Sequence, residues 1–112
     1  MKDFNEIIID FVNASISNGK AQEEGNANQA NKYYRIIEKR KKWLIDNNEL
    51  CNSKFVQLLD HEDDYVRLHV SCALLHEKSE EALRTLMDLT EKKGILGFSA
   101  KMTISEYKKG NI

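Results

Sequence analysis

The stretch LLDHEDDYVRLHVSCALL, residues 58–75, decides the fold that the sequence predicts. Its second half repeats apolar side chains at the three- and four-residue spacing of one helix face, namely Val66, Val70, Ala73 and Leu74. Asp63 precedes that helix, where its carboxylate can accept hydrogen bonds from the first free backbone N–H groups. Arg67 follows Asp63 at the four-residue spacing of a favourable ion pair. We therefore predict structural roles for both residues: Asp63 caps the helix and Arg67 pairs with it.

Two longer segments before this stretch have the same helical periodicity. Residues 3–17 carry apolar side chains on one face, and Asn18-Gly19 predicts the end of that helix. A second helix is predicted to begin near residue 21 or 28 and to end at Asp46. Its buried face is expected to hold Tyr34, Ile37 and Leu44. Asn47-Asn48 then indicates a turn before a short third helix, whose apolar residues are Leu50, Phe55, Leu58 and Leu59.

The C-terminal third predicts two more helices after the one that Asp63 caps. Ser79 is expected to cap the first of them, and Lys92 to Gly94 to close it. The segment GILG, residues 94–97, is expected to be a break before a last helix that stops at Gly110. No segment alternates with the two-residue period of a strand. Residues 1–112 therefore predict a single all-α domain of six helices with short connections.

Composition agrees with one helical domain of nearly zero net charge. The 112 residues contain 17 Lys and Arg, 18 Asp and Glu, five Gly and no Pro, which argues against disorder and against a turn-rich β protein. Asp3, Glu6 and Asp10 interrupt the apolar N-terminal segment, so no signal peptide or membrane span is expected. Cys51 and Cys72 lack a CxxC partner, so we expect reduced cysteines and a cytoplasmic location.

The quoted stretch also resembles the first helices of a HEAT repeat. The matching residues are Leu58, Leu59, Asp63, Val66, Arg67 and Ala73, with Glu62 and Asp64 where that pattern usually has prolines. Over nearly its whole length the chain resembles a family of short bacterial HEAT-like proteins that is catalogued as a domain of unknown function. The segments that carry this resemblance are the helix around Phe11-Val12, NKYYRI at 31–36, LLDHEDDYVRL at 58–68 and GILGFSAKMTISEYKKG at 94–110.

The resemblance implies a fold and a function. The fold is a HEAT-like or armadillo-type α-α superhelix of about two and a half repeats. Members of the family look like immunity proteins that are encoded beside secreted polymorphic toxins. The implied function is that of a cytoplasmic immunity protein, which binds a cognate toxin protein and blocks its toxin domain, for example a nuclease, without catalysis of its own.

Charge is segregated along the chain, and this predicts a partner-binding surface. Residues 20–42 hold seven basic and three acidic side chains, whereas residues 43–64 hold one basic and six acidic. An acidic surface can attract the basic cleft of a nuclease over long range, although such charges can also be merely solvated. Trp43 is a candidate interface anchor next to it. The predicted contact residues are Trp43, Asp46, Glu49, Asp60, Glu62, Asp64 and Tyr65.

Two other groups of residues in the sequence have the composition of binding sites. The basic run Lys39 to Lys42, beside Tyr33 and Tyr34, has the residue types of a nucleic-acid-binding regulator, but a sequence pI of about 6.3 is not typical of one. His69, Cys72 and His76 share a helix stripe, but the two turns between His69 and His76 span about 10 Å and prevent all three from reaching one zinc ion.

No catalytic pattern is present in the sequence. His61 lacks the second histidine of HExxH, the glycines form neither a phosphate loop nor a dinucleotide turn, and GxSxG does not occur. We therefore expect no enzyme, no cofactor, no metal, no small-molecule substrate and no membrane partner. Nucleic acid is not the expected partner either. A general protein-interaction scaffold is the alternative that the sequence does not separate from an immunity protein.

Overall fold

The computed structural model describes residues 2–112, which form six α-helices and one 3-10 helix joined by short turns. The elements are α1 (Phe4–Glu23), α2 (Ala27–Asp46), α3 (Ser53–Val56), η1 (Gln57–Asp60), α4 (Asp64–Ala73), α5 (Ser79–Leu89) and α6 (Gly94–Lys108). Within residues 2–112 there is no strand, so the all-α prediction is confirmed. None of the helices in this range is both long and apolar enough to cross a membrane.

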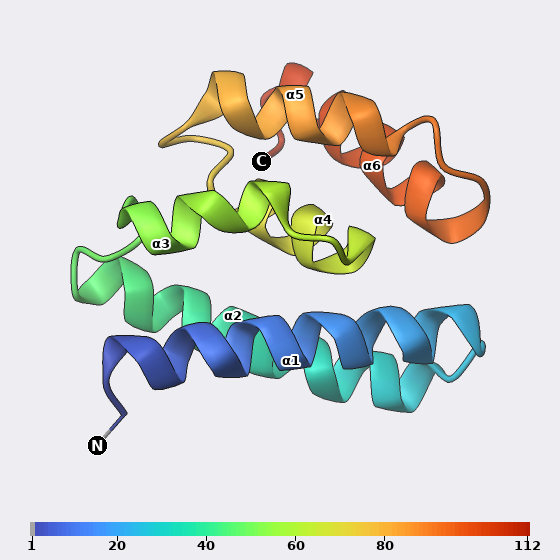
Figure 1. Ribbon diagram of the computed structural model, residues 1–112. Helices are drawn as coiled ribbons and strands as arrows, with labels where there is room; N and C mark the ends of the chain where they lie inside the picture. Colours follow the sequence, from blue (N-terminus) through green and yellow to red (C-terminus); the bar gives the residue numbers. More distant parts are fainter. Residues whose placement is uncertain (1) are drawn as a thin grey trace.

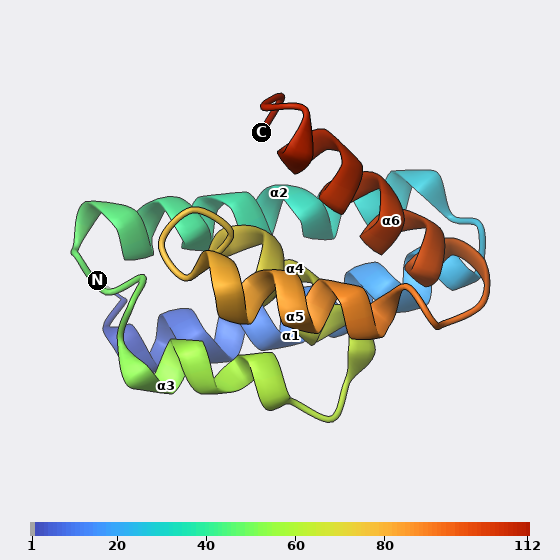
Figure 2. The same cartoon turned by 90° about the horizontal axis from the view of Figure 1, so that it is seen from above.

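The helices are stacked as three pairs (Figures 1 and 2). In Figure 1, α1 and α2 lie at the bottom, α3–η1 and α4 in the middle, and α5 and α6 at the top. The first member of each pair faces the viewer, and α2, α4 and α6 lie behind. Contacts run within the α1–α2 pair and the α5–α6 pair, and α4 packs on α1, η1, α5 and α6. The molecule measures 38 × 31 × 26 Å.

Helix α4 is the centre of the core, which the sequence did not predict. Its ten residues include seven buried ones: Tyr65, Val66, Leu68, His69, Val70, Ser71 and Ala73. A helix that is buried on nearly all sides must be surrounded by other elements, which explains why the chain on both sides of α4 packs against it. Phe11 of α1 and Phe55 of α3 meet edge to face beside it, with ring centroids 5.1 Å apart.

The predicted end of the first helix at Gly19 is wrong. Helix α1 continues to Glu23, and both Asn18 and Gly19 are buried inside it. Tyr65 of α4 packs against Gly19, where an added Cβ atom would lie 2.4 Å from the tyrosine ring. The glycine is required for packing between α1 and α4, and Gly25, with φ of +71°, makes the turn instead.

Two predictions at the C-terminal end are also wrong. Ser79 does not cap α5: Lys78 holds that position, and the Ser79 hydroxyl donates to the Leu75 carbonyl at 2.7 Å. The segment at residues 94–97 is not a break, because it forms the first turn of α6. Gly97 is buried there, and a Cβ atom on it would lie 1.9 Å from the Lys92 carbonyl oxygen. The glycine lets the turn before α6 fold back against the helix.

Candidate protein-binding groove

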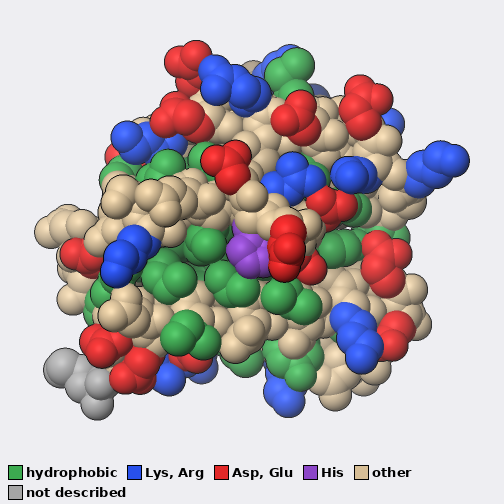
Figure 3. Space-filling model, in the orientation of Figure 1, with side chains coloured by type: hydrophobic (Ala, Val, Ile, Leu, Met, Phe, Trp, Pro, Cys, Tyr) green, Lys and Arg blue, Asp and Glu red, His purple; other side chains and the backbone are tan. Residues whose placement is uncertain are grey.

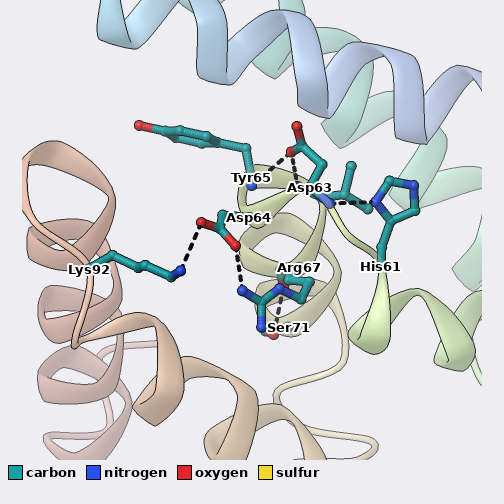
Figure 4. A network of polar contacts seen from close by, with 8 residues as sticks. His61, Asp63, Asp64, Tyr65, Arg67, Ser71 and Lys92 are labelled. Atoms are coloured by element: carbon teal, nitrogen blue, oxygen red, sulfur yellow. Dashed lines mark hydrogen bonds and ion pairs between the residues drawn. The ribbon is translucent and has the colours of Figure 1, made fainter.

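The predicted cap at Asp63 is confirmed. Its Oδ1 accepts hydrogen bonds from the backbone N–H groups of Tyr65 at 2.9 Å and Val66 at 3.0 Å (Figure 4). The backbone N–H of Asp63 in turn donates to Nδ1 of His61 at 2.9 Å. These bonds fix the turn between η1 and α4, so Asp63 holds the start of the central helix in place.

The predicted pair between Arg67 and Asp63 is wrong, because Arg67 pairs with Asp64. Asp64 also forms an ion pair with Lys92, which lies in the turn between α5 and α6; the Lys92 Nζ is 3.5 Å from Asp64 Oδ2 (Figure 4). Burial alone would raise the pKa of Asp64, but the charges of Arg67 and Lys92 outweigh it and hold the pKa below its usual value. Asp64 therefore links α4 to the turn between α5 and α6, and both of its carboxylate oxygens are paired within the protein.

The predicted acidic residues do not form one patch. Asp46 ends α2 and Glu49 follows in the next turn, whereas Asp60 ends η1 and Glu62 lies in the turn before α4, at the other end of the α3–η1 segment (Figures 1 and 2). Asp46 pairs with Lys42 at 2.8 Å. On the face in Figure 3, acidic and basic side chains are interspersed around a hydrophobic seam between α1 and α3–η1.

The two aromatic residues of the predicted surface are not equally accessible. Tyr65 is only 8% exposed, and its hydroxyl donates to Glu23 Oε1 at 2.6 Å. Its position in the core leaves little of the ring for a partner, so the structure shows Tyr65 mainly as a core residue. Trp43 is half-buried and packs against the core, which leaves part of its ring accessible.

The basic run at residues 39–42 is distributed around α2. Consecutive residues of a helix point about 100° apart, so four in a row cannot share one face. Arg40 points toward α1 and donates from Nε to Asp10 at 2.9 Å, while Lys42 pairs with Asp46. Lys39 and Lys41 have no ion-pair partner within residues 2–112. The run is therefore not a continuous stripe that could follow a phosphate backbone.

A groove runs along α2, and we call it the α2 groove. It consists of three adjoining hollows, of 370, 260 and 430 Å³ in the direction from the start of α2 to its end. Tyr34 lines both the first and the second hollow, and Lys41 lines both the second and the third. Helix α6 provides the opposite wall of the first two hollows through Ile95, Ser99 and Thr103. The third hollow is bordered instead by the end of α4, the segment after it and the turn after α2.

The floor of the middle hollow is uncharged at neutral pH. His69 lies there, bonded through Nε2 to Asn18 Oδ1 at 2.8 Å, and burial lowers its pKa to about 4. Cys72 lies beside it, and burial raises the pKa of its thiol. Phe11, Ile37 and Leu68 supply the apolar remainder of the floor. Within residues 2–112, no cluster of three or more His, Cys, Asp or Glu side chains could hold a metal ion.

An exposed apolar row borders the groove on α6. Ile95, Phe98 and Met102 are 43%, 65% and 45% exposed, although each is a large hydrophobic residue. They follow one another at helical spacing, next to the groove-lining Ser99 and Thr103. The buried side of the same helix holds Leu96, Gly97 and Ala100. Helix α6 therefore has two apolar faces, and only one of them is covered.

The groove was not predicted, although part of its pattern is present in the sequence. Tyr34 was expected on the buried face of α2 but is 48% exposed, and Ile45 one helical stripe further on is also exposed. The apolar residues of α6 surround the helix instead of forming one stripe, which indicates more than one contact surface. That α2, α4 and α6 bring these residues to one groove depends on the packing of helices that are distant in sequence.

Comparison with known proteins gives no further assignment. No family model matches the chain, and neither a curated protein nor a solved structure matches it significantly.

Proposed function

We propose that the protein is a protein-binding module without catalysis of its own, and specifically a cytoplasmic immunity protein that binds and blocks a cognate secreted toxin domain, such as a nuclease. The observation that carries the binding role is the exposed row Ile95, Phe98 and Met102 beside the α2 groove. Large apolar side chains gathered next to a concave surface are typical of sites where another protein docks. The toxin partner rests on the family resemblance of the sequence.

We also propose that the three stacked helix pairs are a HEAT-like or armadillo-type superhelix of about two and a half repeats. The order of the pairs along the stack and the placement of α2, α4 and α6 behind their partners support this arrangement (Figure 1). In such a superhelix, one layer of helices lines the binding face. The α2 groove lies in that layer.

Acidic contacts are a second part of this proposal. Asp60 and Glu62 are exposed and have no ion-pair partner within residues 2–112. They would attract a basic toxin surface and increase its association rate. Asp46 and Glu49, at the other end of the α3–η1 segment, would form a separate contact beside Trp43.

The test is co-expression with the toxin domain of a secreted protein that is encoded next to the gene. We expect the intact protein to restore growth and to co-purify with the toxin domain. Phe98→Glu should weaken both, whereas Met87→Glu on α5 should not, because Met87 has a similar exposure, 62% against 65%, but lines none of the three hollows. Absence of rescue by the intact protein would contradict the immunity role. Binding to duplex DNA that falls steeply with salt would instead favour a nucleic-acid-binding regulator.

A further inference from the structure

The middle hollow of the α2 groove contains a hydrogen-bond acceptor that the protein does not use. Asn18 Nδ2 donates to the Ala30 carbonyl at 2.9 Å, which fixes the orientation of the Asn18 amide. Its Oδ1 accepts from Gln22 Nε2 at 2.7 Å and from His69 Nε2 at 2.8 Å, so His69 Nε2 carries the hydrogen. Because burial lowers the pKa of the ring to about 4, His69 is neutral at pH 7 and Nδ1 is an acceptor.

This acceptor is accessible from the hollow although the histidine is in the core. His69 is 8% exposed, and its one hydrogen bond within residues 2–112 is made by Nε2. In this part of the chain, Ser15 Oγ is the one fully covered side-chain N or O atom without a partner, so His69 Nδ1 keeps some accessible surface. Of the three hollows along α2, His69 lines only the middle one, of 260 Å³. A ligand in this hollow can therefore donate a hydrogen bond to Nδ1.

Two opposite charges line the same hollow. They are Glu38 and Lys41, which lie three residues apart on α2, a spacing that places their Cβ atoms about 5–6 Å apart. Neither has an ion-pair partner within residues 2–112. Burial raises the pKa of the Cys72 thiol in this hollow; the Lys41 charge opposes that shift, and the Glu38 charge adds to it. Both charges therefore lie near the same thiol without pairing with each other.

We infer that the middle hollow binds a free aliphatic α-amino acid. Its ammonium group donates to the Glu38 carboxylate and to His69 Nδ1, and its carboxylate accepts from Lys41. Its side chain lies against the apolar part of the floor, which includes Ile37 and Leu68. The amino acid is bound and not converted. This inference goes beyond the proposed protein-binding function and does not depend on it.

The two charges select a zwitterion over a singly charged ligand. A simple carboxylic acid would place a second carboxylate beside Glu38, and a simple amine would place a second ammonium group beside Lys41; like charges brought together oppose binding. The terminal residue of a peptide carries only one of the two charges. At 260 Å³, the hollow is also smaller than the about 300–1,000 Å³ of pockets for drug-sized ligands, which suits a small molecule.

The test is isothermal titration calorimetry of the full-length protein with L-alanine, L-valine and L-leucine. We expect saturable binding of at least one of them. The N-acetyl derivative of that amino acid lacks the ammonium group, and the amide derivative lacks the carboxylate. Each derivative should bind at least about tenfold more weakly, since it loses a charge-assisted hydrogen bond. No binding of any of the three amino acids up to about 10 mM, or equal binding of a derivative, would overturn the inference.

Variants of the two charged residues assign the contacts. Glu38→Gln should weaken binding of the amino acid but not of its N-acetyl derivative, and Lys41→Gln should weaken binding of the amino acid but not of its amide derivative. The matched controls are Lys39→Gln, at an exposed lysine of α2 that lines none of the hollows, and Glu77→Gln, at a carboxylate that lines only the third. Both controls should leave the affinity unchanged. Equal effects of Lys41→Gln and Lys39→Gln would overturn the inference.

NMR of the histidine side chains locates the ligand in the wild-type protein. The ¹⁵N shift of His69 Nδ1 should change when the amino acid is added, because this nitrogen gains a donor. A change at His76, which lines the third hollow, without one at His69 would overturn the inference. Amino-acid binding without rescue from a toxin would contradict only the immunity role, whereas rescue without amino-acid binding would contradict only the present inference.

Discussion

The ring of Tyr65 lies directly on the backbone of Gly19, so closely that a Cβ atom on the glycine would be 2.4 Å from the ring. The hydroxyl of the same tyrosine reaches one turn further along α1 and donates to Glu23 at 2.6 Å. One side chain of α4 thus fixes both the separation and the register of α4 against α1. The contact also explains why a helix continues through a glycine that alone would favour its end.

Gly19→Ala should destabilise the protein, although alanine is the better helix former. Removal of the glycine gains about 1 kcal/mol of helix propensity, but displacing a buried ring costs about 1–3 kcal/mol and separates α1 from α4. We expect a lower urea midpoint with an unchanged slope. A double-mutant cycle with Tyr65→Ala gives the control: the cost of Gly19→Ala should largely disappear when the ring is absent. Equal costs in both backgrounds would contradict the contact as its cause.

His69 should make stability dependent on pH between about 4 and 6.5. The unfolded chain binds a proton below the ordinary histidine pKa of 6.5, whereas the folded protein resists it down to about 4 because the ring is buried. The folded state therefore loses stability as pH falls through this window, and the loss stops below it. The nearby carboxylate of Asp63 opposes part of the effect.

The variant His69→Gln tests this dependence, since glutamine keeps a polar group for Asn18 but does not titrate. Between pH 7 and pH 5 we expect the wild-type protein to lose about 2 kcal/mol more free energy of unfolding than the variant. Urea unfolding at the two pH values measures the difference. An equal loss in both proteins would show that His69 is already protonated in the folded state at pH 5.

Asp64→Asn should cost about 1 kcal/mol, because it removes the charge that holds Arg67 and Lys92. Since the pairs lower the pKa of Asp64, their contribution is fully present above pH 4 and is lost as pH falls through the lowered value. The matched control is Glu62→Gln, an exposed carboxylate with no ion-pair partner within residues 2–112. Thermal unfolding at pH 7 should separate the two variants, and the difference should shrink at high salt. Equal unfolding midpoints for Asp64→Asn and Glu62→Gln would contradict a stabilising role of the Asp64 ion pairs.

Two buried serines offer a matched test of hydrogen bonding inside helices. Ser15 and Ser71 are both fully buried, but Ser71 donates to the Arg67 carbonyl at 2.6 Å, whereas the Ser15 hydroxyl has no partner within residues 2–112. Removal of an unsatisfied hydroxyl from the core should be favourable. We expect Ser15→Ala to be more stabilising than Ser71→Ala by about 1 kcal/mol, measured by urea unfolding. The opposite order would indicate that Ser15 is bonded in solution.

The sequence predicted helices well and their ends poorly. The periodicity around Val66 and the cap at Asp63 are local features, since each depends on residues within one or two turns, and both are confirmed. Gly19 and Gly97 were interpreted as breaks because glycine is a weak helix former. Both are instead buried in helices where another part of the chain comes too close for a side chain. A residue that is distant in sequence decides between the two interpretations.

The arrangement of the candidate site also depends on contacts between residues that are distant in the sequence. The apolar residues around α6 and the basic residues along α2 are visible in the sequence, but the sequence alone does not show which of them share a surface. The acidic residues of 43–64 lie within one short segment of the sequence, but the length of α3–η1 separates them in space. Tyr34 and Ile95 are far apart in the sequence and line one hollow.

The sequence by itself determined the all-α class, the number of helices and the cap of the central helix, because hydrophobic period and capping act over a few residues. The tertiary structure decided the partner of Arg67, the burial of Tyr65 and the existence of the α2 groove. Those features depend on how the faces of different helices meet, and the pattern within one helix does not fix which other helix covers it.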